Sequence, residues 1–256
     1  MKNLFINKYT LTILGIFLFF AIWTVVYFAA GQSNLIFPGP ITTLKEAFSY
    51  FGDPYLYKCI WGSLYRMLIG FSIASIAGIA LGMIVGNYLK IKHVFNPTMI
   101  ALKAVPTAAL IYMLMVLVGF KNAPIYIVMI IVFPMVYEAT VSGYSNLDEE
   151  ILMALRVDSA NGLISNFKVK LPLAFPHIAL GLVSSFALSF KIEIMAEVLT
   201  SSSSVYGLGR AISISFINQY NGLISTFAYS FIAISIMLLV SLIIYFIKKF
   251  IKIKSA

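Results

Sequence analysis

The chain has 256 residues, of which 61% are hydrophobic and 11% are charged, and its mean hydropathy is +0.97. Because soluble domains carry about 25% charged residues, this composition excludes a water-soluble globule and predicts an all-α integral membrane protein that exposes apolar side chains to lipid. The net charge of +9 does not indicate a nucleic-acid partner, since the cations lie between apolar runs rather than on one basic face.

Six apolar stretches are long enough for membrane-spanning helices, each of which needs about 20 residues. They lie near residues 9–30, 59–86, 98–120, 123–143, 174–197 and 223–247. The first apolar run, from Leu11 to Ala30, is longer than the roughly 7–15 residue core of a signal peptide, so we expect an uncleaved span. Residues 1–256 are therefore interpreted as a single transmembrane domain with about six helices.

The distribution of Lys and Arg predicts the orientation of these helices. With the N-terminus inside, twelve of the 18 cations fall on the cytoplasmic side, Lys103 among them. The others lie outside at Lys45, Lys58, Lys121 and Arg210, or within spans at Arg66 and Lys191. Since cytoplasmic flanks carry the excess of positive charge, both termini are expected in the cytoplasm.

Residues 31–58 form a long connection on the outer side. It begins with the proline-broken run Phe37-Pro38-Gly39-Pro40. An amphipathic stretch from Ile41 to Phe51 follows, and we expect it to lie along the membrane interface.

The second span carries small residues at every fourth position. They are Gly70, Ala74, Gly78, Gly82 and Gly86. Such a column lets another helix approach closely in lipid. The partner helix belongs either to the same chain or to a second subunit, and the column alone favours neither.

Charged residues inside spans are costly in lipid and mark candidate functional positions. Arg66 lies about seven residues into the second span from the outer side, and Glu193 and Glu197 share one face near the outer end of the fifth, at similar depth. Lys191 lies roughly 200° around that helix from Glu193. We expect a buried ion pair between Arg66 and these carboxylates. The alternatives are contact of Arg66 with an anionic solute in the translocation path, and snorkelling of Lys191 and Glu197 to the interface.

The largest cytoplasmic connection covers residues 144–173. Leu152 and Leu155, and then Leu163 and Phe167, recur at helical spacing. The dipeptide Asn161-Gly162 between them favours a turn. We therefore expect two short amphipathic helices whose apolar residues dock a protein in the cytoplasm.

The residues needed for catalysis or metal binding do not occur together in the sequence. His93 and His177 have no second ligand at metal spacing, and Cys59 is the only cysteine. There is no phosphate-binding loop, so the chain is not expected to hydrolyse ATP. The sequence predicts no catalytic residue, metal site or cofactor.

The cytoplasmic connection resembles the EAA signature of bacterial ABC importer permeases. The likeness runs from Met153-Ala154-Leu155-Arg156 to Leu171-Pro172. Further segments are similar, in order along nearly the whole chain, to the nitrate, sulfonate and taurine branch of that family. They are Phe37-Pro38-Gly39-Pro40, Ser63-Leu64-Tyr65-Arg66, Gly78 through Gly86, Val105-Pro106, Gly119-Phe120, Phe133-Pro134, Ala196-Glu197 and Gly207-Leu208-Gly209.

The resemblance assigns a set of residues to coupling with an ATPase. They are Ala154, Leu155, Arg156, Ser159, Ala160, Gly162, Leu171 and Pro172. The sequence departs from the family pattern twice. The usual Glu falls at Met153 and the usual turn Gly at Ser159, where Gly162 three residues later can supply the turn.

The resemblance implies a permease of the bacterial cytoplasmic membrane that works as a homodimeric pair in lipid. Each copy would sit on a cytoplasmic ATPase that binds ATP and Mg²⁺, and would receive its solute from an extracytoplasmic binding protein. Members of this branch import nitrate, alkanesulfonates and taurine, and also pyrimidine precursors of thiamine. The alternatives are a permease of another importer branch, for example for amino acids, and an intramembrane enzyme, for which Glu193 and Glu197 are the paired carboxylates.

Overall fold

The computed structural model describes residues 8–157, 163–201, 205–218 and 222–254, and these residues form helices and turns only. Five helices are long and apolar enough to cross a membrane. They are α1 (Lys8–Ala29), α3 (Pro54–Asn87), α6 (Ala123–Ser145), α9 (Leu171–Thr200) and α11 (Gly222–Lys254). A bent pair, α4 (Leu89–Ala104) and α5 (Thr107–Val118), brings the total to six if the pair is one span. The expected all-α membrane architecture is confirmed.

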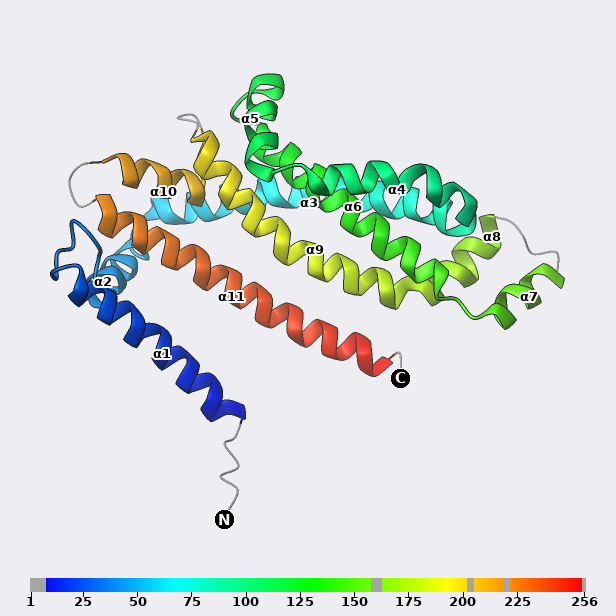
Figure 1. The fold of residues 1–256 in the computed structure, drawn as a ribbon, viewed down its shortest axis with the longest axis horizontal. Helices are drawn as coiled ribbons and strands as arrows, with labels where there is room; N and C mark the ends of the chain where they lie inside the picture. Colours follow the sequence, from blue (N-terminus) through cyan, green and yellow to red (C-terminus); the bar gives the residue numbers. More distant parts are fainter. Residues whose placement is uncertain (1–7, 158–162, 202–204, 219–221, 255–256) are drawn as a thin grey trace, which may run out of the picture.

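The shorter helices gather at the two ends of the bundle (Figure 1). One end carries α2 (Pro40–Tyr50) and α10 (Leu208–Ile217), which lie in the connections expected outside. The opposite end carries α7 (Glu149–Val157), α8 (Leu163–Ser165) and the π-helical turn η1 (Asn166–Lys170). The two ends are called outer and inner below.

The third expected span, 98–120, is a bent pair of helices rather than one straight helix. The axes of α4 and α5 meet at 94°. Pro106 lacks an N–H and disfavours helical backbone in the residue before it. Val105 accordingly has ψ 129°, so α4 ends there and α5 restarts at an angle. Gly119, with φ +81°, ends α5.

The column of small residues on α3 packs within the chain, against α6. A Cβ on Gly70 would lie 2.6 Å from the Ile125 carbonyl oxygen, and one on Gly86 would lie 2.6 Å from the Cβ of Tyr144. Real Cβ contacts are never this short, so only glycine allows the two helices to approach this closely. Of the two interpretations left open by the sequence, packing inside one subunit is therefore the observed one.

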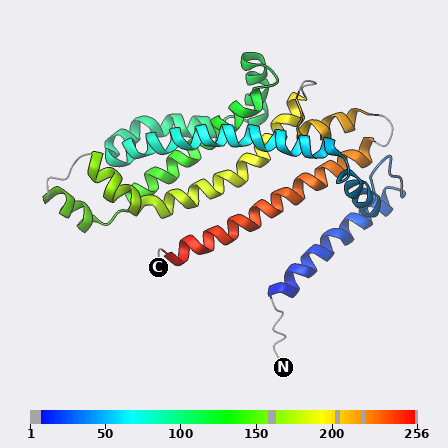
Figure 2. The ribbon, with the colours of Figure 1, turned by 180° about the vertical axis from the view of Figure 1, so that it is seen from behind.

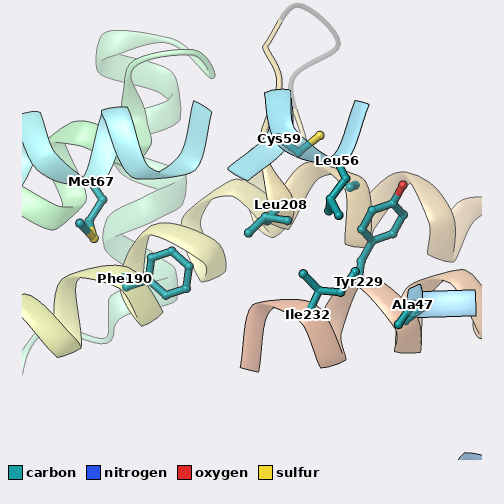
Figure 3. Close-up of a cluster of buried hydrophobic side chains, with 10 residues drawn as sticks. Ala47, Leu56, Cys59, Met67, Phe190, Leu208, Tyr229 and Ile232 are labelled. Carbon is teal, nitrogen blue, oxygen red and sulfur yellow. The ribbon is translucent and has the colours of Figure 1, made fainter. Parts of the chain in front are cut away.

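A buried apolar cluster in the outer half of the bundle joins α2, α3, α9, α10 and α11 (Figure 3). Leu56 and Cys59 of α3 pack there with Leu208 of α10 and Tyr229 of α11. Helix α2 docks onto the same cluster through the Tyr50 ring, which stacks on Tyr229 at 4.5 Å. Burial raises the pKa of Tyr50 to about 12, so this hydroxyl stays protonated and donates to the Glu46 carboxylate at 2.8 Å. The cluster holds α10 and α2 over the outer end of the bundle.

Helix α1 stands apart from the other spans along most of its length (Figures 1 and 2). None of its apolar span is buried inside the chain. Near its outer end the Trp23 indole donates to the Pro38 carbonyl at 3.1 Å, and the Trp23 ring lies 6.3 Å from the ring of Phe227. Its remaining apolar side chains are free to contact lipid or another protein chain.

Candidate functional site

A buried charged cluster joins α3 and α9 in the outer half of the bundle. The Arg66 Nε donates to Glu193 Oε1 at 3.1 Å, and its Nη2 pairs with Glu197 Oε1. The exposed fractions of the three residues are 8%, 0% and 3%, respectively. Arg66 and the two carboxylates, which were predicted to lie at similar depth, are therefore in direct contact.

The same cluster holds the backbone that leads into α10. Arg66 Nη2 also donates to the Tyr206 carbonyl at 2.8 Å, while the Gly209 N–H donates to Glu197 Oε2 at 2.8 Å. Ser63 completes the cluster, because its hydroxyl donates to Glu197 and accepts from the Leu208 N–H at 2.9 Å. These bonds connect two spans to the outer segment before α10, as expected of residues that position this segment.

Glycines make this close contact with the segment before α10. A Cβ on Gly207 would lie 2.6 Å from Arg66 Nη2 and from Glu197 Oε1, and one on Gly209 would lie 2.6 Å from the Glu197 Cβ. The motif Gly207-Leu208-Gly209, singled out in the sequence, therefore lets the chain pass directly over the charged cluster.

Lys191 lies outside this cluster, and Glu197 does not snorkel. Lys191 is exposed, whereas the next residue but one, Glu193, is fully buried. The angular separation on α9 explains the difference, since residues two apart point to nearly opposite faces. The snorkelling alternative is therefore wrong for Glu197, whose carboxylate is held by Arg66, Ser63 and a backbone N–H.

A second pair of charges, which sequence reasoning did not recognise, joins α4 and α6. Lys103 Nζ donates to Glu138 Oε1 at 2.6 Å, and both side chains are nearly half exposed. Lys103 was expected among the cytoplasmic flanks but lies in the last turn of α4. Glu138 lies inside the predicted span 123–143, near its inner end, and a charge within a span was the signal that could have identified it.

Glu138 belongs to a polar stripe on α6 that faces away from the body of the chain. Ser142 and Ser145, four and seven residues further on, are exposed as well. Residues at these spacings share one helix face. Since polar side chains avoid lipid, this face of α6 suits water or another protein chain.

The predicted coupling segment forms the inner end of the molecule. Helix α7 carries Ala154, which is exposed, and Leu155, which is half-buried, while Arg156 belongs to the same helix. Exposed apolar side chains surround them on both sides of the turn: Met153, Ile164, Phe167 and Phe175. The predicted Ser159, Ala160 and Gly162, with the turn at Asn161, lie outside the described residues.

The second short helix of the coupling segment runs directly into α9 instead of ending before it. The π-helical turn η1 lies immediately before Leu171 and Pro172. Proline cannot donate the N–H that a regular helix requires, and a π-turn shifts the bonding partner from i−4 to i−5. The Leu171 N–H accordingly donates to the Asn166 carbonyl. Movement of the coupling segment is therefore linked to α9 through continuous helix.

Polar bonds also fasten this turn to the inner ends of α3 and α6. The Tyr144 hydroxyl donates to Asn166 Oδ1 at 2.8 Å, and Asn87 Nδ2 donates to the same oxygen at 3.1 Å. Lys170 Nζ donates to Asn87 Oδ1 at 2.9 Å. The coupling segment thus contacts three spans.

Comparison with known proteins identifies a related family. The family described as "binding-protein-dependent transport system inner membrane component" matches residues 78–253, which is more than half of the chain. The nitrate import permease protein NrtB of Leptolyngbya laminosa is 27% identical over 207 residues, covering 76% of this chain and 72% of that protein. The bicarbonate transport system permease protein CmpB of Synechococcus elongatus is 28% identical over 219 residues, covering 78% and 74%.

A solved structure shares the fold. A chain of the MetNI methionine ABC transporter, determined in inward-facing conformations, superposes with a TM-score of 0.62 at 16% sequence identity. The match covers 77% of this chain and 96% of the other. The described helices therefore share the fold of that ABC transporter chain.

Proposed function

The chain belongs to the family of binding-protein-dependent transport system inner membrane components, and on that premise we propose that two copies form a path for a small oxyanion into the bacterial cell. The chain is the permease subunit of an ATP-driven importer and a transporter component rather than an enzyme. Membership of the family implies an ATPase and a solute-binding protein as partners.

The inner end of the molecule is the proposed seat of the ATPase, which would bind ATP with Mg²⁺. Support comes from the apolar side chains that α8 and η1 leave exposed, Ile164 at 72% and Phe167 at 54%. Apolar patches of this kind favour protein contact. The charge distribution supports the same orientation, since Lys168, Lys170 and the C-terminal lysines lie toward this end. We accordingly propose that both termini lie in the cytoplasm and that the membrane is the bacterial cytoplasmic membrane.

The proposed pairing of two copies is supported by the apolar surface of α5. Tyr112, Met113, Val116 and Leu117 on this bent helix are between 54% and 87% exposed. In the proposed dimer, the second copy would cover the side of α5 that faces the translocation path, and lipid would cover the opposite side.

Relatives named for two different small oxyanions support the substrate class most directly, because each match covers more than two thirds of both chains. Nitrate and bicarbonate are both planar anions with three oxygens. Alkanesulfonates, expected from the sequence resemblance, present three oxygens on one face. A path that accepts such solutes needs hydrogen-bond donors and uncompensated positive charge.

The test is a ligand screen on the solute-binding protein encoded beside this permease, because that protein delivers the solute. Purified binding protein is titrated calorimetrically with nitrate, bicarbonate, methanesulfonate and taurine, and with amino acids and thiamine-type pyrimidines as competing classes. Saturable binding of an oxyanion is the expected result. Selective binding of an amino acid or a pyrimidine would refute the proposed substrate class.

A further inference from the structure

A cavity of about 330 Å³ lies between α4 and α6, toward the inner end of the bundle and separate from the Arg66 cluster. Its polar lining comes from Lys92 and Asn96 of α4 and from Tyr137, Glu138, Ser142 and Ser145 of α6. Ligand pockets measure roughly 300–1,000 Å³, so this space is larger than a single ordered water requires. It lies on the polar stripe of α6 described above.

Two residues that line this cavity carry side-chain donors without a hydrogen-bond partner in the described chain. The Tyr137 side chain is 1% exposed, and its hydroxyl has no hydrogen-bond partner among the described residues. A buried hydroxyl without a partner is unfavourable, and an unsatisfied group in a native fold calls for a ligand or a water. Asn96, which also lines the cavity, forms no side-chain hydrogen bond to the rest of the described chain.

One cation that lines the cavity has no anionic partner in the part of the chain that the structure describes. The carboxylate of Glu138 is already paired with Lys103 at 2.6 Å. Lys92 is half-buried and forms no ion pair within the described ranges. The cavity therefore offers one uncompensated ammonium together with hydroxyl and amide donors, which is the donor set that binds small oxyanions.

We propose that this cavity binds the oxyanion in transit, with the Tyr137 hydroxyl and the Lys92 ammonium as its donors. The inference rests on the proposed function and adds a binding site to it. A lipid phosphate has the same chemistry as a free oxyanion, but the exposed Glu138, Ser142 and Ser145 around the opening suit water rather than lipid. The occupant is accordingly a dissolved anion.

Single-residue variants test these two donors. Tyr137→Phe removes one oxygen that makes no bond within the described chain, so the fold is expected to tolerate it. Lys92→Gln removes the charge and keeps most of the stem. Tyr126→Phe on α6 and Lys90→Gln on α4 are matched controls, because neither residue lines the cavity.

The measurement is the anion-dependent rise in melting temperature of the permease with its ATPase partner in nanodiscs, without binding protein. Nitrate, bicarbonate and methanesulfonate are the probes. A hydrogen bond to a charged group is strong enough that its loss weakens binding about tenfold or more. We expect this shift in half-saturating concentration for Tyr137→Phe and Lys92→Gln, and no shift for the two controls.

The outcomes separate the site from the function. Half-saturation that is unchanged in both cavity variants overturns the proposed site. The proposed site is also overturned if the wild-type protein responds to anions in phosphatidylcholine nanodiscs but loses this response when phosphatidylglycerol is added. In that case a lipid headgroup, rather than a dissolved anion, occupies the cavity. If the variants lose binding as expected but the complete complex with its binding protein imports none of the three anions, the site stands and the proposed function fails.

Discussion

Replacement of Arg66 by alanine removes the single cation that neutralises two buried carboxylates in the described cluster. Glu193 is fully buried and Glu197 is 3% exposed, so neither charge can reach water. Breaking a buried ion pair by removing one partner destabilises a protein by about 3–5 kcal/mol. The same change removes the bond from Arg66 to the Tyr206 carbonyl, which holds the segment before α10.

Two second-site variants distinguish the roles of the carboxylates. Glu193 Oε2 has no hydrogen-bond partner in the described chain, whereas Glu197 keeps the donors Ser63 and Gly209 after Arg66 is lost. In the Arg66→Ala background, Glu193→Gln should therefore restore more stability than Glu197→Gln. This order follows from which carboxylate is left without donors.

The assay is thermal unfolding of the purified permease in detergent, together with co-purification of the ATPase. We expect a clear loss of melting temperature and of assembly for Arg66→Ala, and partial recovery in the order given above. Lys191→Ala is the matched control, because Lys191 is exposed on the opposite face of α9. If Arg66→Ala is fully assembled and stable and has lost only its affinity for anions, the positioning role is refuted and Arg66 belongs to the translocation path.

Three further predictions address packing, orientation and coupling. Gly82→Ala should destabilise the chain by about 1–3 kcal/mol, because the new methyl group would collide with Thr140 of α6. Gly15→Ala is the control, because a Cβ at Gly15 has no neighbour within 4 Å in the described chain. Equal melting temperatures for the two variants would contradict the packing of α3 against α6. The orientation is tested in a chain whose buried Cys59 has been replaced. In that background, Lys168→Cys should react with impermeant maleimide only after the cells are opened, whereas Asn218→Cys should react in intact cells. The reverse pattern would refute the orientation. Ala154→Asp should detach the ATPase by placing an unpaired charge in an apolar contact, while Ala154→Ser retains it; normal co-purification of the Asp variant would exclude this docking surface.

The sequence predicted the Arg66 cluster because helix geometry converts residue number into depth and face. Arg66 and the pair Glu193 and Glu197 lie at equal depth, and residues four apart share a face. Ser63 and the backbone of Tyr206 could not be predicted in the same way. Their contacts depend on the path of the chain before α10, and a sequence carries no direct signal for the position of a backbone carbonyl.

The bend of the third span was less predictable for a different reason. Pro106 was visible, but prolines also occur inside continuous helices, as Pro134 does in α6. Glu138 was missed because its span stays strongly apolar, with a mean hydropathy of 1.9. Averages over a window conceal a single charge, whereas the structure shows that this charge pairs with Lys103.

The most direct test of the whole account is transport by the reconstituted complex. The permease, its ATPase and its binding protein are placed in proteoliposomes with the ATPase facing the bath, and labelled nitrate, bicarbonate or methanesulfonate is supplied with the binding protein inside. The account predicts export of one of these anions from the lumen to the bath, only when ATP and the binding protein are both present. Movement that is independent of ATP, or ATP-driven movement of an amino acid in place of every oxyanion, would contradict it.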